Sequence, residues 1–216
     1  VYKDDDESYK IWKDVIGVPE HKIQKGDKDN FWHMNIPGPC GPCSEIFIDR
    51  GPEYGEDGGP IGGGEDRFIE IWNLVFMQSI QDEPYNVVDD LPAKNIDTGM
   101  GLERMAMVLQ EKDSPFEIDT FQNLYNELNK YIVNKDKKYE RIVLDHIKSA
   151  VFMISDGVVP TNEGRGYVLR RIIRRAVRAI YRLTDELISL ELLINIVISD
   201  YQDSYPELLE NKDKIL

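Results

Sequence analysis

Cysteine and histidine are scarce in this sequence, which has two cysteines and three histidines in 216 residues. Long apolar runs are also absent, because the longest apolar cluster, residues 187–198, is interrupted by Ser189, Glu191 and Asn195. A helix that crosses a membrane needs roughly 20 consecutive apolar residues. Because the sequence has no such run and no signal peptide, we expect no membrane partner and a cytoplasmic location.

Two common nucleotide-binding loops are missing too. The phosphate-binding loop ends in Gly-Lys-Ser or Gly-Lys-Thr, which occurs nowhere here, so Gly62-Gly63-Gly64 does not belong to one. The segment Gly99-x-Gly101-x-x-Arg104 lacks the third glycine of the dinucleotide fingerprint, and no βαβ pattern follows it. A nucleotide would therefore need another kind of site.

The two cysteines form Cys40-Gly41-Pro42-Cys43, which matches the thioredoxin-type redox motif. That motif follows a strand and opens a helix, whereas Pro37-Gly38-Pro39 precedes this string and the alternating residues 45–49 follow it. We interpret residues 40–43 as a rigid loop with reduced thiols that enters a strand. A redox protein is the weakest of three hypotheses, and the lack of a nearby histidine pair argues against zinc.

The pattern changes along the chain, and this change predicts two domains. Residues 1–112 mix strand-like and helix-like segments with glycine-rich loops, and residues 113–216 are helical with short turns, as in an antiparallel bundle. The expected fold class is α+β, followed by an all-α bundle. The expected helices are residues 8–16, 101–110, 118–133, 139–155, 163–183, 185–201 and 206–214; the expected strands are 44–49, 67–78 and 94–98; loops are expected at 26–41, 51–64 and 82–92.

The strand expected at residues 67–78 is apolar on both faces, which predicts a central strand that is covered on both sides. Asn73 and Val75 share one face because side chains alternate along a strand. A buried amide such as that of Asn73 needs a hydrogen-bond partner, which is either an ordinary protein group or a ligand.

Charge is unevenly distributed. The net charge of −14 opposes general binding to nucleic acid, yet residues 162–182 contain seven arginines and one acid, Glu163. In a helix, Leu169, Ile173, Ala176 and Ile180 form one apolar stripe, and the arginines lie beside it. These crowded cations need either acids from the rest of the protein or phosphates from a partner.

The segment Asn95–Arg104 combines an acid, two glycines and an arginine within ten residues. Asp97 offers a negative charge, Gly99 and Gly101 leave room for a ligand near the backbone, and Arg104 can lie on a π-face or grip a phosphate. This set fits a molecule with both an amine and a nucleotide. The alternative is a strand–turn–helix corner with glycine at its bend.

Taken together, these strings resemble the alanyl-tRNA synthetase family of class II aminoacyl-tRNA synthetases. The similar strings follow the family order along nearly the whole chain. They are residues 30–32 (NFW), 38–46 (GPCGPCSEI), 70–78 (EIWNLVFMQ), 97–104 (DTGMGLER), 145–147 (DHI), 155–160 (SDGVVP) and 162–171 (NEGRGYVLRR).

The resemblance implies a partial class II antiparallel sheet and an alanine site in the first domain. Asp97 would bind the α-ammonium of alanine and Gly99 would keep the pocket small. Trp32, Asn73 and Val75 would line the pocket.

The resemblance also implies ATP and Mg²⁺ as cofactors. Arg104 would lie against the adenine, and Asp97, Gly99 and Arg104 would form the catalytic set of motif 3. Glu45 is a weaker candidate for contact with ATP or Mg²⁺, and no firm metal ligand is expected. Glu70 falls on the opposite strand face by simple alternation and is left out.

The second domain would bind the acceptor stem of alanine tRNA. The resemblance implies that Asn162 reads a G·U pair in that stem and that arginines hold its phosphates. These arginines are Arg165, Arg170, Arg171, Arg174, Arg175 and Arg178.

Motifs 1 and 2 of the class are absent, which leads us to expect an internal fragment that is inactive alone. The editing region, where zinc is expected, is also absent. The parent would make alanyl-adenylate from alanine and ATP and transfer the alanyl group to the tRNA 3′ end. The alternative is a non-catalytic RNA-binding helical module. The sequence predicts no oligomeric state.

Overall fold

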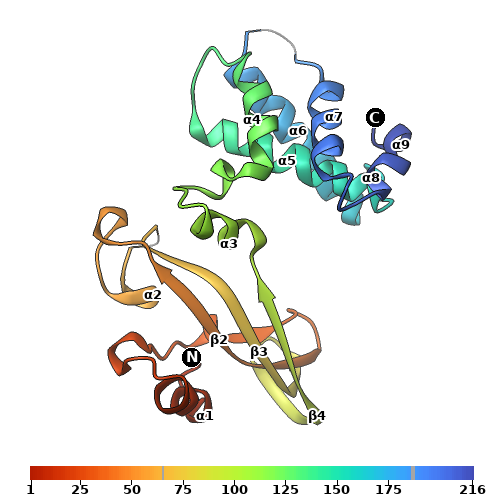
Figure 1. Cartoon of the computed structure of the whole chain (residues 1–216). Coiled ribbons are helices and arrows are strands. Elements are labelled where there is room, and N and C mark those ends of the chain that lie inside the picture. Colours follow the sequence, from red (N-terminus) through yellow and green to blue (C-terminus); the bar gives the residue numbers. More distant parts are fainter. Residues whose placement is uncertain (65, 186–187) are drawn as a thin grey trace. The chain divides into compact units, whose positions relative to one another are not determined.

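The computed structural model describes residues 1–64, 66–185 and 188–216. The chain forms two compact units, Val1–Leu109 and Gln110–Leu216. The first unit combines an antiparallel sheet with flanking helices, and in the second unit the described residues form helices and turns (Figure 1). The expected α+β fold class is confirmed.

The sheet of the first unit has the order β1-β2-β3-β4, and all neighbours are antiparallel. Its strands are β1 (Phe31–His33), β2 (Gly38–Asp49), β3 (Phe68–Glu83) and β4 (Asn86–Met100). Helix α3 (Leu102–Leu109) follows β4 directly. The expected central position of β3 is confirmed because β3 lies between β2 and β4. Its expected burial on both faces is wrong, since most of its side chains are only half-buried.

Residues 40–43 lie inside β2, so their interpretation as a loop was wrong. Glycine and proline usually weaken or end strands, but here a register shift between Cys40 and Cys43 accommodates them. Gly41 also allows β3 to approach closely, because a Cβ atom at Gly41 would lie 2.0 Å from the carbonyl oxygen of Phe76. The loop expected at residues 26–41 likewise contains the short strand β1.

The connection expected at residues 82–92 is mostly strand. Strands β3 and β4 are joined by a tight turn in which Tyr85 has φ +67°. Almost every residue of β4 is exposed, so no buried face imposes an alternating pattern on its sequence. This explains why residues 86–93 resemble a polar loop in sequence.

The N-terminal segment packs on the sheet through Trp12, whose Nε1 donates to Oγ of Ser44 over 3.1 Å. Helix α1 (Asp6–Lys10) is capped by Asp5, whose side chain accepts from the amide of Ser8, and a π-helical turn continues it to Val15. Short elements complete the unit: 3-10 turns at Glu20–Lys22, Lys28–Asn30 and Pro52–Tyr54, and helix α2 (Gly59–Gly62).

Helix α5 is the centre of the helical unit and contacts α4, α6, α7, α8 and α9. Asp136 caps its N-terminus by accepting from the amide of Lys138. Val143, Leu144 and Val151 of this helix are almost fully buried. The bounds are α4 (Asp119–Asn129), α5 (Lys137–Ser155), α6 (Gly164–Leu183), α7 (Leu190–Tyr201), α8 (Glu207–Glu210) and α9 (Lys212–Ile215), after a 3-10 turn at Pro115–Glu117.

Two helix predictions need correction. The helix expected at residues 206–214 is divided at Asn211 into α8 and α9. The helix expected at residues 185–201 begins at Leu190, and part of the expected start, residues 186–187, lies outside the described residues.

Candidate functional site

The first candidate site is one face of the sheet, where strand register aligns the residues expected to bind alanine. Asn73 lies opposite Glu45 on β2 and opposite Gly99 on β4. In the next row, Val75 lies opposite Cys43 on β2 and opposite Asp97 on β4. Paired residues in a sheet share a face, and so do residues two apart on one strand. These two rows therefore form a continuous surface across β2, β3 and β4.

Asn73 links two of these strands and keeps one unused acceptor. Its Nδ2 donates to Oε1 of Glu45 over 3.0 Å, whereas its Oδ1 is buried without a hydrogen-bond partner. On the other side, a Cβ atom at Gly99 would meet nothing within 4 Å. Asn73 thus pairs with a residue, Gly99, whose side-chain position on this face is empty, while its own amide oxygen is buried and unpaired. A buried acceptor of this kind is costly unless something binds it.

Glu45 is a half-buried carboxyl group on this face. Burial raises the pKa of the Glu45 carboxyl, and the charge of Glu70 raises it further. Burial also raises the pKa of the Cys43 thiol to about 12, with a further contribution from Glu45, and burial raises the pKa of Cys40. Both cysteines are free. Thiols with raised pKa values are poor nucleophiles, which disfavours the redox hypothesis.

Glu70 lies on this face, so the expectation that it falls on the opposite strand face was wrong. A register shift between Ile46 and Phe47 places Phe47 opposite Glu70, whereas Glu45 lies opposite Asn73. The irregularity reverses the alternation and brings Glu70 to the face of Glu45. Simple alternation could not reveal this, because a β-bulge leaves no clear sequence signal.

Arg104 lies in the first turns of α3 and contacts Glu70. Its Nη1 donates to the backbone oxygen of Glu70 over 2.9 Å and to Oε2 over 3.3 Å. The amide of Gly101 donates to the backbone oxygen of Ile71, which joins the start of α3 to β3. Arg104 is half exposed, so its guanidinium plane remains accessible to a ligand.

The structure brings together Glu45, Asn73, Val75, Asp97 and Gly99, with Arg104 attached through Glu70. Asp97 is exposed, and its Oδ1 accepts from the amide of Thr98 over 2.8 Å. Trp32 lies on β1, opposite Gly41 of β2. Strand β2 therefore separates Trp32 from Asn73 in the sheet order.

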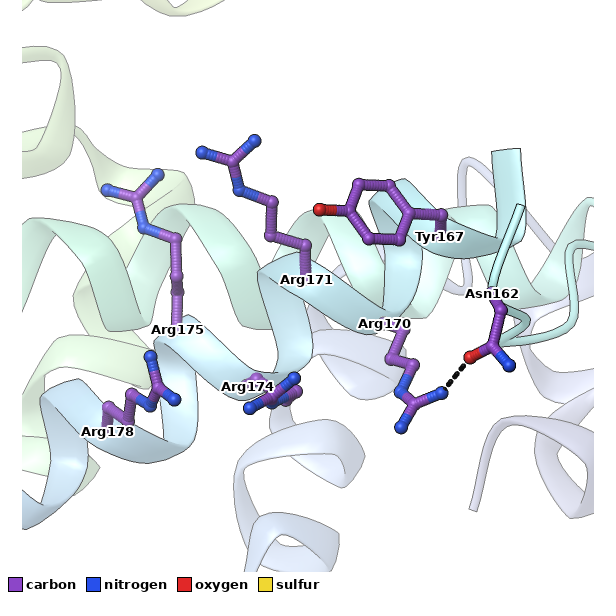
Figure 2. A pocket seen from close by; sticks show the side chains of 7 residues that line it. All are labelled: Asn162, Tyr167, Arg170, Arg171, Arg174, Arg175 and Arg178. Atoms are coloured by element: carbon purple, nitrogen blue, oxygen red, sulfur yellow. Dashed lines mark hydrogen bonds between the residues drawn. The ribbon is translucent and has the colours of Figure 1, made fainter. Parts of the chain in front are cut away.

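The second candidate site is a groove of about 550 Å³ along α6 (Figure 2). It contains most of the residues expected to contact RNA, but Arg165 is not among its lining residues. Tyr167 lines the groove and was not among the expected contact residues. The lining residues are Asn162, Tyr167, Arg170, Arg171, Arg174, Arg175 and Arg178.

The loop before α6 positions Asn162 at one end of this groove. Nη1 of Arg170 donates to Oδ1 of Asn162 (Figure 2). The loop lies tightly on the helix at Gly166, where a Cβ atom would lie 2.2 Å from Oγ1 of Thr161 and 2.3 Å from the carbonyl oxygen of Val159. Only glycine allows this approach, which sets where Asn162 stands.

The arginines of α6 are exposed to solvent. Leu169, Ala176 and Ile180 of the expected apolar stripe are buried, and Ile173 is half-buried. Among the described residues, none of the seven arginines of α6 forms an ion pair with an aspartate or glutamate. Within the helical unit, this favours phosphate contact over bridging to the protein's own acids.

Neither a metal-binding cluster nor a membrane-spanning helix is found among the described residues. They contain no group of three or more His, Cys, Asp or Glu side chains that could hold a metal ion. Across the same residues, no helix is long and apolar enough to cross a membrane.

Comparison with known proteins gives the family. A family model described as "tRNA synthetases class II (A)" matches residues 1–216. The chain belongs to this family.

Alanine--tRNA ligases of Thermobifida fusca, Corynebacterium diphtheriae and Streptomyces avermitilis are similar to the chain, with 48%, 46% and 47% identity. Each alignment covers the whole chain but only 26%, 26% and 25% of these relatives, respectively. The chain thus spans about a quarter of the length of the curated relatives it matches.

Proposed function

We propose that this chain is the part of a cytoplasmic alanine–tRNA ligase that lines the alanine and ATP sites and binds the acceptor stem of alanine tRNA. Residues 1–112 would serve as the C-terminal part of the aminoacylation domain and residues 113–216 as part of the tRNA-recognition domain. The proposal rests on one observation above all: a single sheet face gathers Glu45, Asn73, Val75, Asp97 and Gly99.

The alanine site follows from the two rows of this face. The carboxylate of Asp97 binds the α-ammonium of alanine, a group with three donors. The unused Oδ1 of Asn73 supplies a further acceptor within the same surface. Val75 and Trp32 contribute apolar walls, and Gly99 provides space beside Asn73.

The nucleotide site lies at the end of this face. A guanidinium plane stacks well on a purine, and half-exposed Arg104 is available for that contact. Mg²⁺ is usually held by one or two carboxylates together with substrate phosphates. Glu45 and Glu70 fit that role, since they share a face and repel each other. When bound, Mg²⁺ offsets negative charge on the phosphates.

The reaction needs positioning more than acid–base chemistry. A carboxylate oxygen of alanine forms a bond to the α-phosphorus of ATP while the bond to pyrophosphate breaks. A hydroxyl at the 3′ end of the tRNA then attacks the alanyl carbonyl, loses its proton, and releases AMP. Asp97, Asn73 and Arg104 act by holding the amine and the purine in place.

The pocket has a limited selectivity. Residues larger than alanine can be excluded sterically, but a missing methylene or an added hydroxyl changes binding by only about 10–200-fold. Glycine and serine are therefore not rejected well enough by this face alone. A separate editing site is required in the complete enzyme.

In the helical unit, the arginine groove binds acceptor-stem phosphates, and Asn162 contacts base edges. Its amide can both donate hydrogen bonds to base edges and accept them. The bond from Arg170 to Oδ1 fixes the orientation of this amide and leaves its Nδ2 available as a donor.

The test is alanine-dependent ATP–pyrophosphate exchange by the native polypeptide that carries this chain. Asp97→Asn should lower kcat/KM for alanine at least 100-fold, because it removes the charge opposite the ammonium. Asp90→Asn, on the same exposed strand, is the control and should change kcat/KM for alanine less than threefold. Equal effects of the two variants would reject the assignment. We expect the 216-residue chain alone to give no exchange.

A second candidate function is a non-catalytic RNA-binding module, favoured by the groove whose arginines form no ion pair with an acid among the described residues. Binding of an acceptor-stem hairpin to the chain should weaken steeply with salt in either case. Loss of G·U preference in Asn162→Ala supports specific readout, whereas equal loss for all stems indicates backbone contact only. Absence of exchange in the native polypeptide, with RNA binding retained, would favour the module.

A further inference from the structure

The groove on α6 contains one residue that phosphate binding does not explain. Tyr167 is 51% exposed, yet it lines the groove among arginines. Figure 2 shows its ring lying along the groove with the hydroxyl end toward Arg171. Among the described residues, no other aromatic ring and no cation packs against the ring of Tyr167. Its apolar face is therefore available to a partner.

Helix geometry places this ring in line with the cations. Tyr167, Arg171, Arg174 and Arg178 follow one another at intervals of three or four residues, which puts them on one side of a helix. An aromatic ring interleaved with arginines is the arrangement that binds unpaired nucleotides, because the ring stacks on a base while the cations hold its phosphates. A base inside a duplex offers no free face to such a ring.

We propose that Tyr167 stacks on an unpaired nucleotide next to the end of the RNA duplex, while Arg171 and Arg174 hold the adjoining phosphates. This inference rests on the proposed RNA-binding function of the groove and adds a preference for a single-stranded end. Tyr167 acts through its ring rather than through its hydroxyl group.

Helix α6 supplies a matched control. Tyr181 is 58% exposed on the same helix but does not line the groove. It should contribute little to binding of the unpaired nucleotide. Comparing the two tyrosines separates a specific platform from the general effect of an exposed ring.

The experiment measures binding of the 216-residue chain to two RNA hairpins by fluorescence anisotropy. One hairpin has a blunt acceptor stem, and the other adds a four-nucleotide 3′ overhang. The unmodified chain should bind the overhang hairpin about tenfold more tightly, within the range for stacking on one base. Tyr167→Phe and Tyr181→Ala should keep this preference, and Tyr167→Ala should abolish it. Arg174→Ala should weaken binding to both hairpins.

A second readout does not depend on affinity. With 2-aminopurine as the first overhang base, the unmodified chain and Tyr167→Phe should quench its fluorescence at saturation, and Tyr167→Leu should not. Circular dichroism establishes that each variant is folded.

The possible failures are distinct. Equal binding of both hairpins by the unmodified chain, or an overhang preference that survives in Tyr167→Ala, overturns the role of Tyr167 but leaves the groove as an RNA site. Failure to bind either hairpin overturns both this inference and the proposed function of the helical unit.

Discussion

Asn73 donates through Nδ2 to Oε1 of Glu45 over 3.0 Å, while Oδ1 of the same amide is buried without a partner. The two ends of one side chain therefore have different roles. Nδ2 donates to a half-buried carboxylate whose pKa is raised by burial and by the charge of Glu70. Oδ1 is buried without a partner on the strand row that Asn73 shares with Gly99. Asn73 therefore links two strands of the sheet through Glu45 and also lies on the face proposed to bind alanine.

Replacement of Asn73 by alanine should destabilise the first unit by about 1–3 kcal/mol, because Glu45 loses a donor in a partly buried position. The pKa of Glu45 should rise further, since the bond favours the charged form. Urea unfolding at pH 7 measures the first effect. Asn95→Ala, which removes an exposed amide of β4, is the control and should change stability by less than about 0.5 kcal/mol. Equal effects would show that Asn73 does not stabilise Glu45.

The pair Asp49–Arg67 predicts the acid sensitivity of the sheet. Nε and Nη2 of Arg67 lie 2.7 and 3.0 Å from the two carboxylate oxygens of Asp49. These bonds lower the pKa of Asp49 to about 2, with a further contribution from the amide of Gly51. An unfolded chain has an aspartate pKa near 3.9. The pair therefore stabilises the fold fully above about pH 4, and this contribution is lost as pH falls through about 2.

Asp49→Asn should accordingly make the thermal midpoint of unfolding less dependent on pH between pH 5 and pH 2. The unmodified chain should lose more stability than the variant over that range. Asp57→Asn is the control. Asp57 is exposed, and its Oδ2 lies 3.7 Å from Nη2 of Arg67, farther than either carboxylate oxygen of Asp49. Parallel curves for Asp49→Asn and the unmodified chain would contradict the prediction.

The proposed alanine face could be partly predicted from sequence because strand parity is a local rule. Asn73 and Val75 are two residues apart, and the register confirms that they share a face. Parity failed at Glu70 because the irregularity between Ile46 and Phe47 depends on pairing with β2. Such a bulge is a property of two strands, and one strand's sequence does not contain it.

The errors in the sheet have a similar cause. Residues 40–43 contain Gly and Pro, which locally favour a loop, yet close packing against Phe76 makes Gly41 a strand residue. The first part of β4, residues 86–93, is exposed and polar, so only pairing with β3 reveals it, whereas the strand expected at residues 94–98 lies within β4. The helix α6 was easier to predict, because its apolar stripe is set by burial within its own unit. The local sequence pattern therefore predicts where helices and strands occur, and pairing between strands determines where the strands begin and end.

Gly166→Ala should disturb the loop that carries Asn162. The added Cβ atom would overlap Oγ1 of Thr161 and the carbonyl oxygen of Val159, so the loop must move. We expect a loss of about 1–3 kcal/mol in stability, as for other overpacked sites. Discrimination between G·U and G·C hairpins should fall more than affinity for either, because the arginines remain in place. Gly62→Ala, whose Cβ atom meets nothing, controls for the glycine change itself.

If the variant keeps full discrimination while it loses stability, the loop does not position Asn162 for readout. Hairpin binding at two salt concentrations measures both quantities. An unchanged salt slope would show that phosphate contacts are retained.

Gly99→Ala separates the proposed pocket from the stability of the sheet. Apart from Gly99 and its two chain neighbours, no atom of the described residues lies within 4 Å of the added Cβ atom, so the variant should be as stable as the unmodified chain within about 0.5 kcal/mol. In the strand register, that Cβ atom stands opposite Asn73, where the alanine side chain would bind. In the native polypeptide, KM for alanine in ATP–pyrophosphate exchange should therefore rise at least tenfold, whereas KM for ATP should change less than threefold. An unchanged KM for alanine would place the amino acid away from this face, since the added methyl group would then occupy space that the substrate does not use.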